Sequence, residues 1–279
     1  MGERVRRGNT RITGKEQFYT PSSVAAHVVD LIVTRYPEAP DRIWVEPCGG
    51  TGTFLDAFEA VGVTRMWSGD IEPHDPRVKL EDFLAGGPSD DEVAGAVVAT
   101  NPPFGRNNSL SVPFFNRAAR FASVIAFIVP RSWRKWSVID RLNLHYHLVI
   151  DEDLHIDYET VDRQMISRAG NLQTCIQVWE RREELREKHV VHDRGYVTKT
   201  DPGNADVSLT IFGRGCGTVK TDFPRVTNTT QMFLKVRDLE VLEAMCTINF
   251  SRFFNSVAYT EALSLKEINF LLNEYFDQR

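Results

Sequence analysis

The segment with the clearest potential for chemistry is Asn-Pro-Pro-Phe at 101–104, which follows the apolar run 95–100. Two prolines fix the backbone and remove two N–H donors, so this turn offers carbonyl oxygens that can only accept hydrogen bonds. The amide oxygen of Asn101 adds an acceptor, and Phe104 adds an aromatic plane. Two acceptors beside a ring suit an exocyclic amine on a flat, extruded base, which would stack on the aromatic ring. The predicted catalytic residues are Asn101, Pro102, Pro103 and Phe104.

A glycine-rich loop at 46–54, Glu-Pro-Cys-Gly-Gly-Thr-Gly-Thr-Phe, separates an expected strand from an expected helix. Open α/β sheets bind ligands at such junctions, and glycines let the backbone approach a ligand closely. The spacing is not Gly-x-Gly-x-x-Gly, so a dinucleotide is not the expected ligand. Taken alone, the loop is equally typical of a tight strand-to-helix turn.

Two acidic segments follow the loop, at 69–73 and 81–84. An acid at the end of the second strand can accept both hydroxyls of a ribose, and Asp70 is better placed for this than Glu72. Asp82 can accept from the exocyclic amine of an adenine while Phe83 packs on the ring face. Together with the glycine-rich loop, these acids predict a nucleoside-containing cofactor.

In their order, the segments 18–21 (Phe-Tyr-Thr-Pro), 46–54, 69–73, 81–84 and 101–104 resemble the S-adenosylmethionine-dependent adenine-N6 methyltransferases. The likeness is greatest to the DNA-modifying group, known from restriction–modification systems, in which a recognition region follows the catalytic core. It covers roughly residues 15–182. The resemblance implies S-adenosylmethionine as cofactor, without a metal. It implies cofactor-binding roles for Tyr19, Thr20, Pro21, Glu46, Cys48, Gly50, Asp70, Asp82, Phe83 and Asn101. Trp179 is a candidate for the family's later aromatic motif, although a core tryptophan is the more natural interpretation.

The implied reaction is direct methyl transfer to the exocyclic N6 of a flipped adenine in DNA. RNA is an alternative substrate, because the two hydrogen-bond acceptors would contact only the amine of the base and not the sugar. A protein glutamine amide is a more distant one. A catalytically inactive, nucleic-acid-binding subunit is disfavoured, since the glycines, Asp70 and Asn101 are all retained.

The elements that must position these residues alternate between apolar runs and helical stretches, which indicates a parallel sheet with helices on both faces. We expect an α/β, Rossmann-like class I methyltransferase sheet, plus a small C-terminal α+β region. Strands are expected in 42–47, 65–73, 95–104, 123–130, 145–154 and 172–181, and helices after Pro21 and in 53–62 and 111–122. The expected organisation is a basic arm at 1–15, a catalytic domain at 16–184 and a target-recognition region at 185–279.

The partner expected from composition is nucleic acid bound by a local basic patch. Of the 279 residues, 33 are Lys or Arg and 38 are Asp or Glu, so binding through bulk positive charge is excluded. The segment 130–136 interleaves cations with tryptophans, and an amphipathic surface helix is an equal alternative. The predicted nucleic-acid-binding residues are Arg131, Trp133, Arg134 and Lys135. DNA is the expected partner, RNA is possible, and a dimer or partner subunit is an open option.

The remaining composition is that of a soluble globular protein, with 42% hydrophobic and 25% charged residues. The longest apolar run, 123–130, is too short to span a membrane, and the N-terminal residues lack a signal-peptide pattern. The four cysteines contain no Cys-x-x-Cys pair, which argues against a zinc site or a disulfide framework. We therefore expect a cytoplasmic protein with reduced thiols and no membrane partner.

Overall fold

The structure of the chain is a computed structural model that describes residues 18–105, 108–162, 164, 172–223, 229–254, 256–257 and 260–278. Two compact units divide between Glu187 and Lys188. The expected basic arm at 1–15 lies outside the described residues. The recognition role of the second unit stays a prediction.

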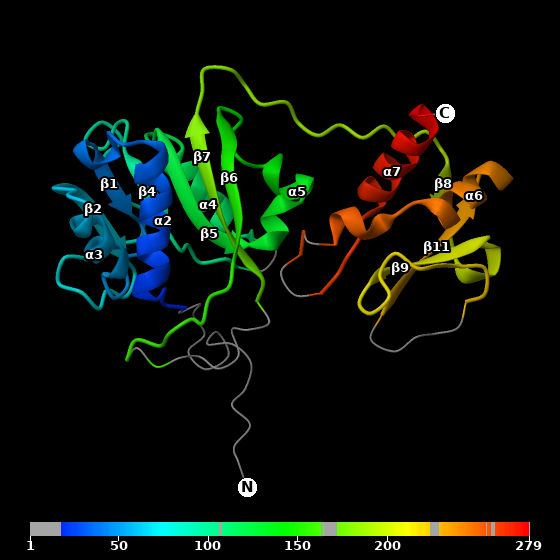
Figure 1. The fold of residues 1–279 in the computed structure, drawn as a ribbon, viewed down its shortest axis with the longest axis horizontal. Helices are drawn as coiled ribbons and strands as arrows, with labels where there is room; N and C mark the ends of the chain where they lie inside the picture. The colour runs from blue at the N-terminus through cyan, green and yellow to red at the C-terminus, as the bar shows by residue number, and fades with distance from the viewer. Residues whose placement is uncertain are drawn as a thin grey trace, which may run out of the picture. The chain divides into compact units, whose positions relative to one another are not determined.

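The first unit holds a mixed sheet whose described strands follow the order β3-β2-β1-β4-β5-β7-β6 (Figure 1). Its strands are β1 (Ile43–Glu46), β2 (Arg65–Asp70), β3 (Lys79–Leu80), β4 (Val97–Thr100), β5 (Val124–Pro130), β6 (Tyr146–Leu154) and β7 (Thr174–Arg181). Its helices are α2 (Ser22–Arg35), α3 (Thr53–Ala60), α4 (Ser111–Ala118) and α5 (Trp136–Ile139), with short 3-10 turns η1 (Ala39–Asp41) and η3 (Arg131–Arg134). The predicted α/β class is confirmed.

The expectation of a parallel sheet is wrong for one strand. Strands β3, β2, β1, β4 and β5 pair in parallel. Strand β7 instead runs antiparallel to both β5 and β6. A parallel return needs a crossover, usually a helix. The described part of the connection between β6 and β7 contains none. Runs of buried residues look alike in both directions, so the sequence pattern did not reveal the reversal.

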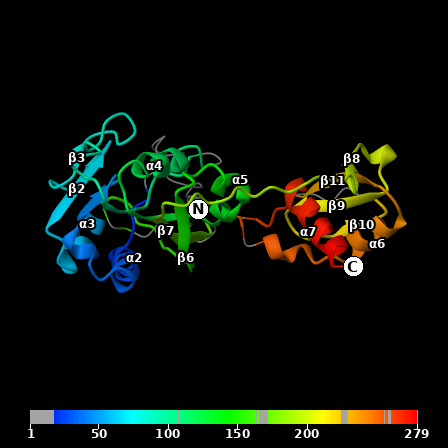
Figure 2. The ribbon, with the colours of Figure 1, turned by 90° about the horizontal axis from the view of Figure 1, so that it is seen from above.

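Helices cover both faces of this sheet (Figure 2). On one face α2 and α3 pack against Trp44 and Val97, and on the other α4 and α5 pack against Val98 and Phe127. Alternate residues of β4 therefore face opposite cores, as the period-2 geometry of a strand requires. The carboxyl ends of β1, β2 and β4 lie at one edge of this sheet, and the predicted site residues follow these strand ends.

The second unit is a four-stranded antiparallel sheet with helices. Its described strands follow the order β10-β9-β11-β8, where β8 is Val197–Lys199, β9 is Val207–Phe212, β10 is Val219–Lys220 and β11 is Thr230–Val236. The helices are α6 (Leu239–Thr247) and α7 (Leu265–Asp277), with short turns η5 (Pro202–Asn204) and η6 (Phe250–Phe253). Helix α7 begins with a capping box between Ser264 and Glu267. The predicted α+β character of this region is confirmed.

Candidate active site

A cavity of about 650 Å³ lies where the chain leaves β1, β2, β3 and β4. This is within the usual size of a small-molecule site, roughly 300–1,000 Å³. All four predicted motifs and the 18–20 segment contribute to its wall. The lining residues include Phe18, Tyr19, Thr20, Cys48, Gly50, Asp70, Asp82, Phe83, Asn101, Pro102, Pro103 and Phe104. The sequence motifs thus converge on a single cavity.

Asn101 lines this cavity, and its side chain contains an unpaired acceptor. Its Nδ2 donates to the backbone carbonyl of Phe18 at 3.0 Å. Because only the amide nitrogen can donate to a carbonyl, this bond fixes which way the amide faces. The Oδ1 is buried and has no hydrogen-bond partner among the described residues. A buried unpaired acceptor is costly, so its persistence at a cavity wall suits a ligand that donates a hydrogen.

The turn after Asn101 is held by the elements that follow it. The backbone carbonyl of Phe104 accepts from the N–H of Leu110. Asn108, buried in a left-handed conformation with φ of 59°, approaches the hydroxyl of Ser132 at 3.4 Å. The indole of Trp133 donates to the hydroxyl of Ser111 at 3.1 Å. The 3-10 turn η3 therefore supports residues 108–111 through Asn108 and Ser111.

The glycine-rich loop is fastened to the end of β2 through Asp70. One carboxylate oxygen accepts from Gly50 N–H at 2.9 Å, and the other accepts from Glu72 N–H at 2.8 Å. Burial raises the pKa of this carboxyl, although both N–H donors act in the opposite direction. Asp70 lines the cavity, and a carboxylate oxygen can accept more than one hydrogen bond, so binding of ribose hydroxyls stays a prediction that these contacts allow.

Tyr19 covers the glycine-rich loop from the side of the 18–21 segment. Its backbone forms an isolated antiparallel bridge with Glu159. A Cβ atom placed on Gly50 would meet the Tyr19 ring at 2.9 Å, so only glycine fits beneath the ring. Burial, reinforced by the charges of Asp70 and Glu72, raises the pKa of Tyr19 to about 12. The phenol is therefore protonated at neutral pH and can donate.

The predicted adenine contacts differ in exposure. Asp82 is exposed, and one of its oxygens accepts from the N–H of Leu84. Phe83 is buried among Trp67, Phe114 and Phe121, so only part of its ring reaches the cavity wall.

The apolar lining residues that sequence reasoning missed include Ile71 and Leu84, which are 61% and 37% exposed. The sequence signal that could have revealed Ile71 is its place as a single apolar residue between Asp70 and Glu72.

Two predicted cofactor residues, Pro21 and Glu46, are not part of the cavity wall. Pro21 precedes α2 as its N-cap residue.

Glu46 is fully buried, and one oxygen accepts from Cys48 N–H at 2.9 Å and from the Thr100 hydroxyl at 2.5 Å. Glu46 thereby ties the glycine-rich loop to the residue preceding Asn101. Burial raises the pKa of Glu46 to about 8, against the effect of the two donors. Burial likewise raises the pKa of the Cys48 thiol well above its usual value, so this thiol is not a nucleophile.

A pH dependence of stability follows from Glu46. The unfolded chain loses this proton near pH 4.5, whereas the folded chain keeps it until about pH 8. The folded state therefore binds more protons in this window, and its stabilisation is complete below pH 4.5 and lost as pH rises toward 8. Urea unfolding of the cofactor-free protein should show this decline, by up to about 1.4 kcal/mol per pH unit. Glu46→Gln should remove it, and parallel curves for the two proteins would contradict the assignment.

The structure does not support the predicted nucleic-acid role for three of the four residues in 131–135. Trp133 is fully buried, so it cannot stack on a base. Arg131 pairs with Asp153 at 2.7 Å, and Arg134 pairs with Asp151 and Asp153. Lys135 has no ion pair within the described part of the chain, and its role stays a prediction. The signal that misled was composition, since the acids that neutralise these arginines follow about twenty residues later on β6.

Arg134 should therefore matter for stability. Arg134→Ala removes hydrogen bonds to two exposed carboxylates and should lower the free energy of unfolding by about 1 kcal/mol. Lys135→Ala, the neighbouring control, should change it by less than about 0.5 kcal/mol. Denaturant titration of both variants checks this, and equal midpoints would show that the ion pairs contribute nothing.

Trp179, the candidate later aromatic motif, is a core residue. It is fully buried on β7 and packs edge-to-face on Phe115. The core interpretation is confirmed.

The strand order β3-β2-β1-β4-β5 is that of Rossmann-like α/β sheets, and β7 is reversed relative to these strands. No protein-family model and no curated protein sequence matches the chain. One similar solved structure is a proposed RNA methyltransferase from Pyrococcus horikoshii, with a TM-score of 0.47 and 15% identity over 60% of this chain and 88% of that one. Another is the modification subunit of a proposed type I restriction enzyme from Vibrio vulnificus. Its TM-score is 0.43, and it is 16% identical over 62% of this chain and 46% of that one.

A third similar structure is the type IIG restriction endonuclease BpuSI, with a TM-score of 0.44 and 12% identity over 85% of this chain and 33% of that one. The chain thus spans less than half of the two restriction proteins. At these TM-scores and identities the likenesses do not indicate a substrate, so activity has to be inferred from the site. Within the described residues, no helix is long and apolar enough to cross a membrane.

Proposed function

We propose that the chain transfers a methyl group from S-adenosylmethionine to the exocyclic N6 of adenine in DNA. The observation that carries the proposal is the Oδ1 of Asn101, a buried acceptor without a partner among the described residues, on the wall of the cavity. That cavity also contains the glycine-rich loop and Asp70, whose chemistry suits a nucleoside cofactor.

The residues present fit this cofactor. The loop 47–51 passes without side-chain bulk at Gly50, where a Cβ would strike Tyr19. Asp70 would accept from the ribose hydroxyls, and Asp82 from the adenine amine. Ile71 and Leu84 would cover the adenine ring from two sides. Cys48 and Thr20 would lie against the methionine portion.

The chain's own residues orient the acceptor amine. Asn101 Oδ1 would accept a hydrogen bond from one N–H of the adenine amine. The backbone carbonyl of Pro102 would accept from the other N–H. The Phe104 ring would stack on the base. S-adenosylmethionine supplies an electrophilic methyl group on its sulfonium. The amine nitrogen forms the new C–N bond as the C–S bond breaks, and its surplus proton leaves to solvent. Rate enhancement then comes from alignment and exclusion of water.

The test is incubation of the protein with S-adenosylmethionine and separate DNA and RNA pools, followed by nucleoside mass spectrometry. N6-methyladenine in DNA is the expected product. The same mark in RNA alone would keep the residue roles and replace the substrate. No mark in either pool, with cofactor binding intact, would refute the proposal that nucleic acid is the acceptor for the protein acting alone.

A further inference from the structure

The predicted adenine contacts, Asp82 and Phe83, lie in a segment, 81–90, that contains no helix or strand. The preceding strand β3 is two residues long, and both residues are exposed. Inside the segment, the carbonyl of Asp82 accepts from the N–H of Gly86 at 2.8 Å, which closes a turn. A turn fixes the local shape of the chain but not where it lies. The place of Asp82 and Phe83 therefore depends on contacts with other elements.

Arg117, in the last turn of α4, reaches the far end of this segment. Its Nη1 donates to Asp90 Oδ1 at 2.5 Å, and its Nη2 donates to the carbonyl of Pro88 at 3.0 Å. The side chain is 14% exposed. A charge that is largely removed from water has to be paired and hydrogen-bonded, and these contacts meet that need. Arg117 thereby fastens the segment 81–90 to α4.

Arg117 also contacts Phe83 itself. Its guanidinium lies over the Phe83 ring, 5.5 Å from the centroid, and over the Phe121 ring at 5.4 Å. Such cations are attracted by the face of the ring. Phe114, three residues earlier on the same face of α4, packs on Phe83 with ring centroids 5.4 Å apart. One face of α4 thus holds both the ring that lines the cavity and the turn that follows it.

We propose that Arg117 is a positioning residue for adenine recognition, which places Asp82 and Phe83 at the cavity and thereby sets the preference of the cofactor site for an adenine base. Arg117 is not part of the cavity wall, so it acts through these two residues. This inference rests on the proposed function, because it concerns the cofactor of that reaction. Contact residues bind selectively only when the groups behind them hold them in place.

The experiment compares two ligands on the full chain by titration calorimetry, S-adenosylhomocysteine and S-inosylhomocysteine. The inosine ligand has a carbonyl oxygen where adenine has its amine, so it cannot donate that hydrogen to Asp82. The wild-type protein should bind the adenosine ligand about tenfold more tightly, which is the contribution of one hydrogen bond to a charged group. In Arg117→Ala this preference should fall to about threefold or less, because a displaced Asp82 forms the bond poorly.

A second measurement needs no ligand. Hydrogen exchange of the Gly86 N–H, which donates to the Asp82 carbonyl, should be faster in cofactor-free Arg117→Ala than in the wild type, because local opening sets the exchange rate. Arg117→Lys keeps a cation beside Asp90 but loses the bond to the Pro88 carbonyl. It should lie between the wild type and Arg117→Ala in both measurements.

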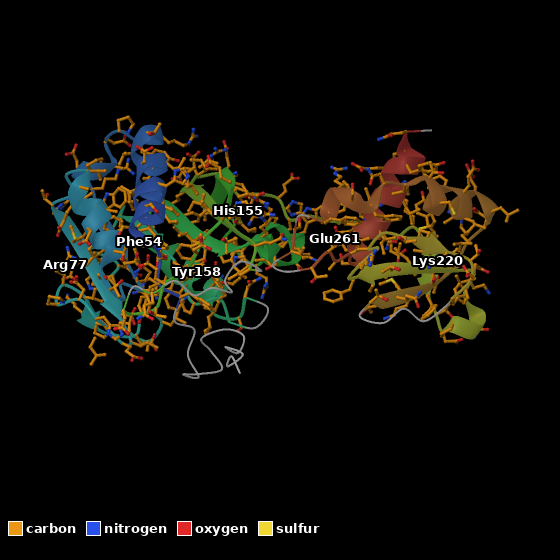
Figure 3. All side chains as sticks on the ribbon, turned by 60° about the horizontal axis from the view of Figure 1, so that its bottom comes forward. Phe54, Arg77, His155, Tyr158, Lys220 and Glu261 are labelled. Atoms are coloured by element: carbon orange, nitrogen blue, oxygen red, sulfur yellow. The ribbon has the colours of Figure 1, made fainter. Side chains whose placement is uncertain are left out.

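Arg120→Ala is the matched control. Arg120 pairs with the other oxygen of Asp90 at 2.8 Å, but its side chain is 64% exposed. Its removal should leave the preference for adenine and the exchange rate at wild-type values. Arg77 pairs with two acids of α3 and with Asp75 (Figure 3), and these contacts lie outside the segment 81–90. Arg77→Ala should therefore also keep the preference for adenine.

The outcomes separate this inference from the proposed function. A wild-type preference in a folded Arg117→Ala, or an equal loss of affinity for both ligands, would overturn the positioning role while methyl transfer survives. If Arg117→Ala does not fold, a wild-type preference in Arg117→Lys overturns it instead. A preference that falls as expected, in a protein that methylates no nucleic acid, would support this inference and refute the proposed acceptor. A wild-type protein that binds neither ligand would refute both.

Discussion

Asn101→Ala should abolish methyl transfer while S-adenosylmethionine still binds. The substitution removes the buried, unpaired Oδ1 of a cavity-lining residue, and it leaves Asp70, Asp82 and the glycine-rich loop in place. Removal of one preorganised hydrogen-bonding group from a reacting centre costs roughly 10²–10³ in rate. Single-turnover transfer of labelled methyl measures the rate, and titration calorimetry measures cofactor affinity.

Two variants make that result interpretable. Asn204→Ala removes the same amide from the second unit, where Asn204 only hydrogen-bonds Asp201, and it should transfer methyl at the wild-type rate. Asn101→Asp keeps an oxygen but loses the Nδ2 bond to the Phe18 carbonyl, so it should be impaired as well. Near-normal turnover in Asn101→Ala would refute the catalytic assignment. If Asn101→Ala lost cofactor affinity together with methyl transfer, the main role of Asn101 would be to bind the cofactor.

Gly50→Ala should lower cofactor affinity by about tenfold or more. Gly50 has a φ of 44°, and its added Cβ would meet the Tyr19 ring at 2.9 Å. Overpacking of this size costs about 1–3 kcal/mol, and relief requires the ring or the loop to move away from the cavity. Both routes also disturb the N–H that Gly50 donates to Asp70. Calorimetric titration with S-adenosylmethionine measures the loss.

Gly62 provides the matched control for this effect. It also has a positive φ, 89°, but nothing lies within 4 Å of a Cβ placed there. Gly62→Ala should therefore show only the backbone strain of a left-handed residue, about 1–2 kcal/mol of stability, with cofactor affinity unchanged. Equal affinities for the two variants would mean that the Tyr19–Gly50 contact does not shape the cofactor site.

Several predicted site residues converge on one cavity because of where each stands in the sequence. Asn101, Asp70 and the loop around Gly50 each follow a buried strand, and the carboxyl ends of neighbouring parallel strands meet at one edge. Residue type and strand assignment therefore sufficed to bring them together. The cavity-lining position of Ile71 depends instead on how far its side chain is exposed, which composition does not reveal.

The features that the sequence did not reveal depend on distant partners. The arginines at 131 and 134 looked free because their neighbours in sequence are not acidic, yet Asp151 and Asp153 lie beside them in the fold. The reversal of β7 likewise depends on pairing with β5 and not on its own composition. Period and propensity describe a strand but not its direction.

The bond between Asn101 and the Phe18 carbonyl, whose residues are 83 positions apart, also bears on the order of events during translation. Phe18 leaves the ribosome early, but its segment is anchored by the backbone bridge from Tyr19 to Glu159 and by the Phe18–Tyr158 ring contact. Residues 18–20 therefore lack part of their docking surface until β6 and the segment after it have been synthesised. In a nascent chain, residues 18–20 are therefore synthesised before the other cavity-lining residues but reach their folded position after them. A ribosome-bound chain truncated before residue 155 should consequently fail to protect these residues from proteolysis.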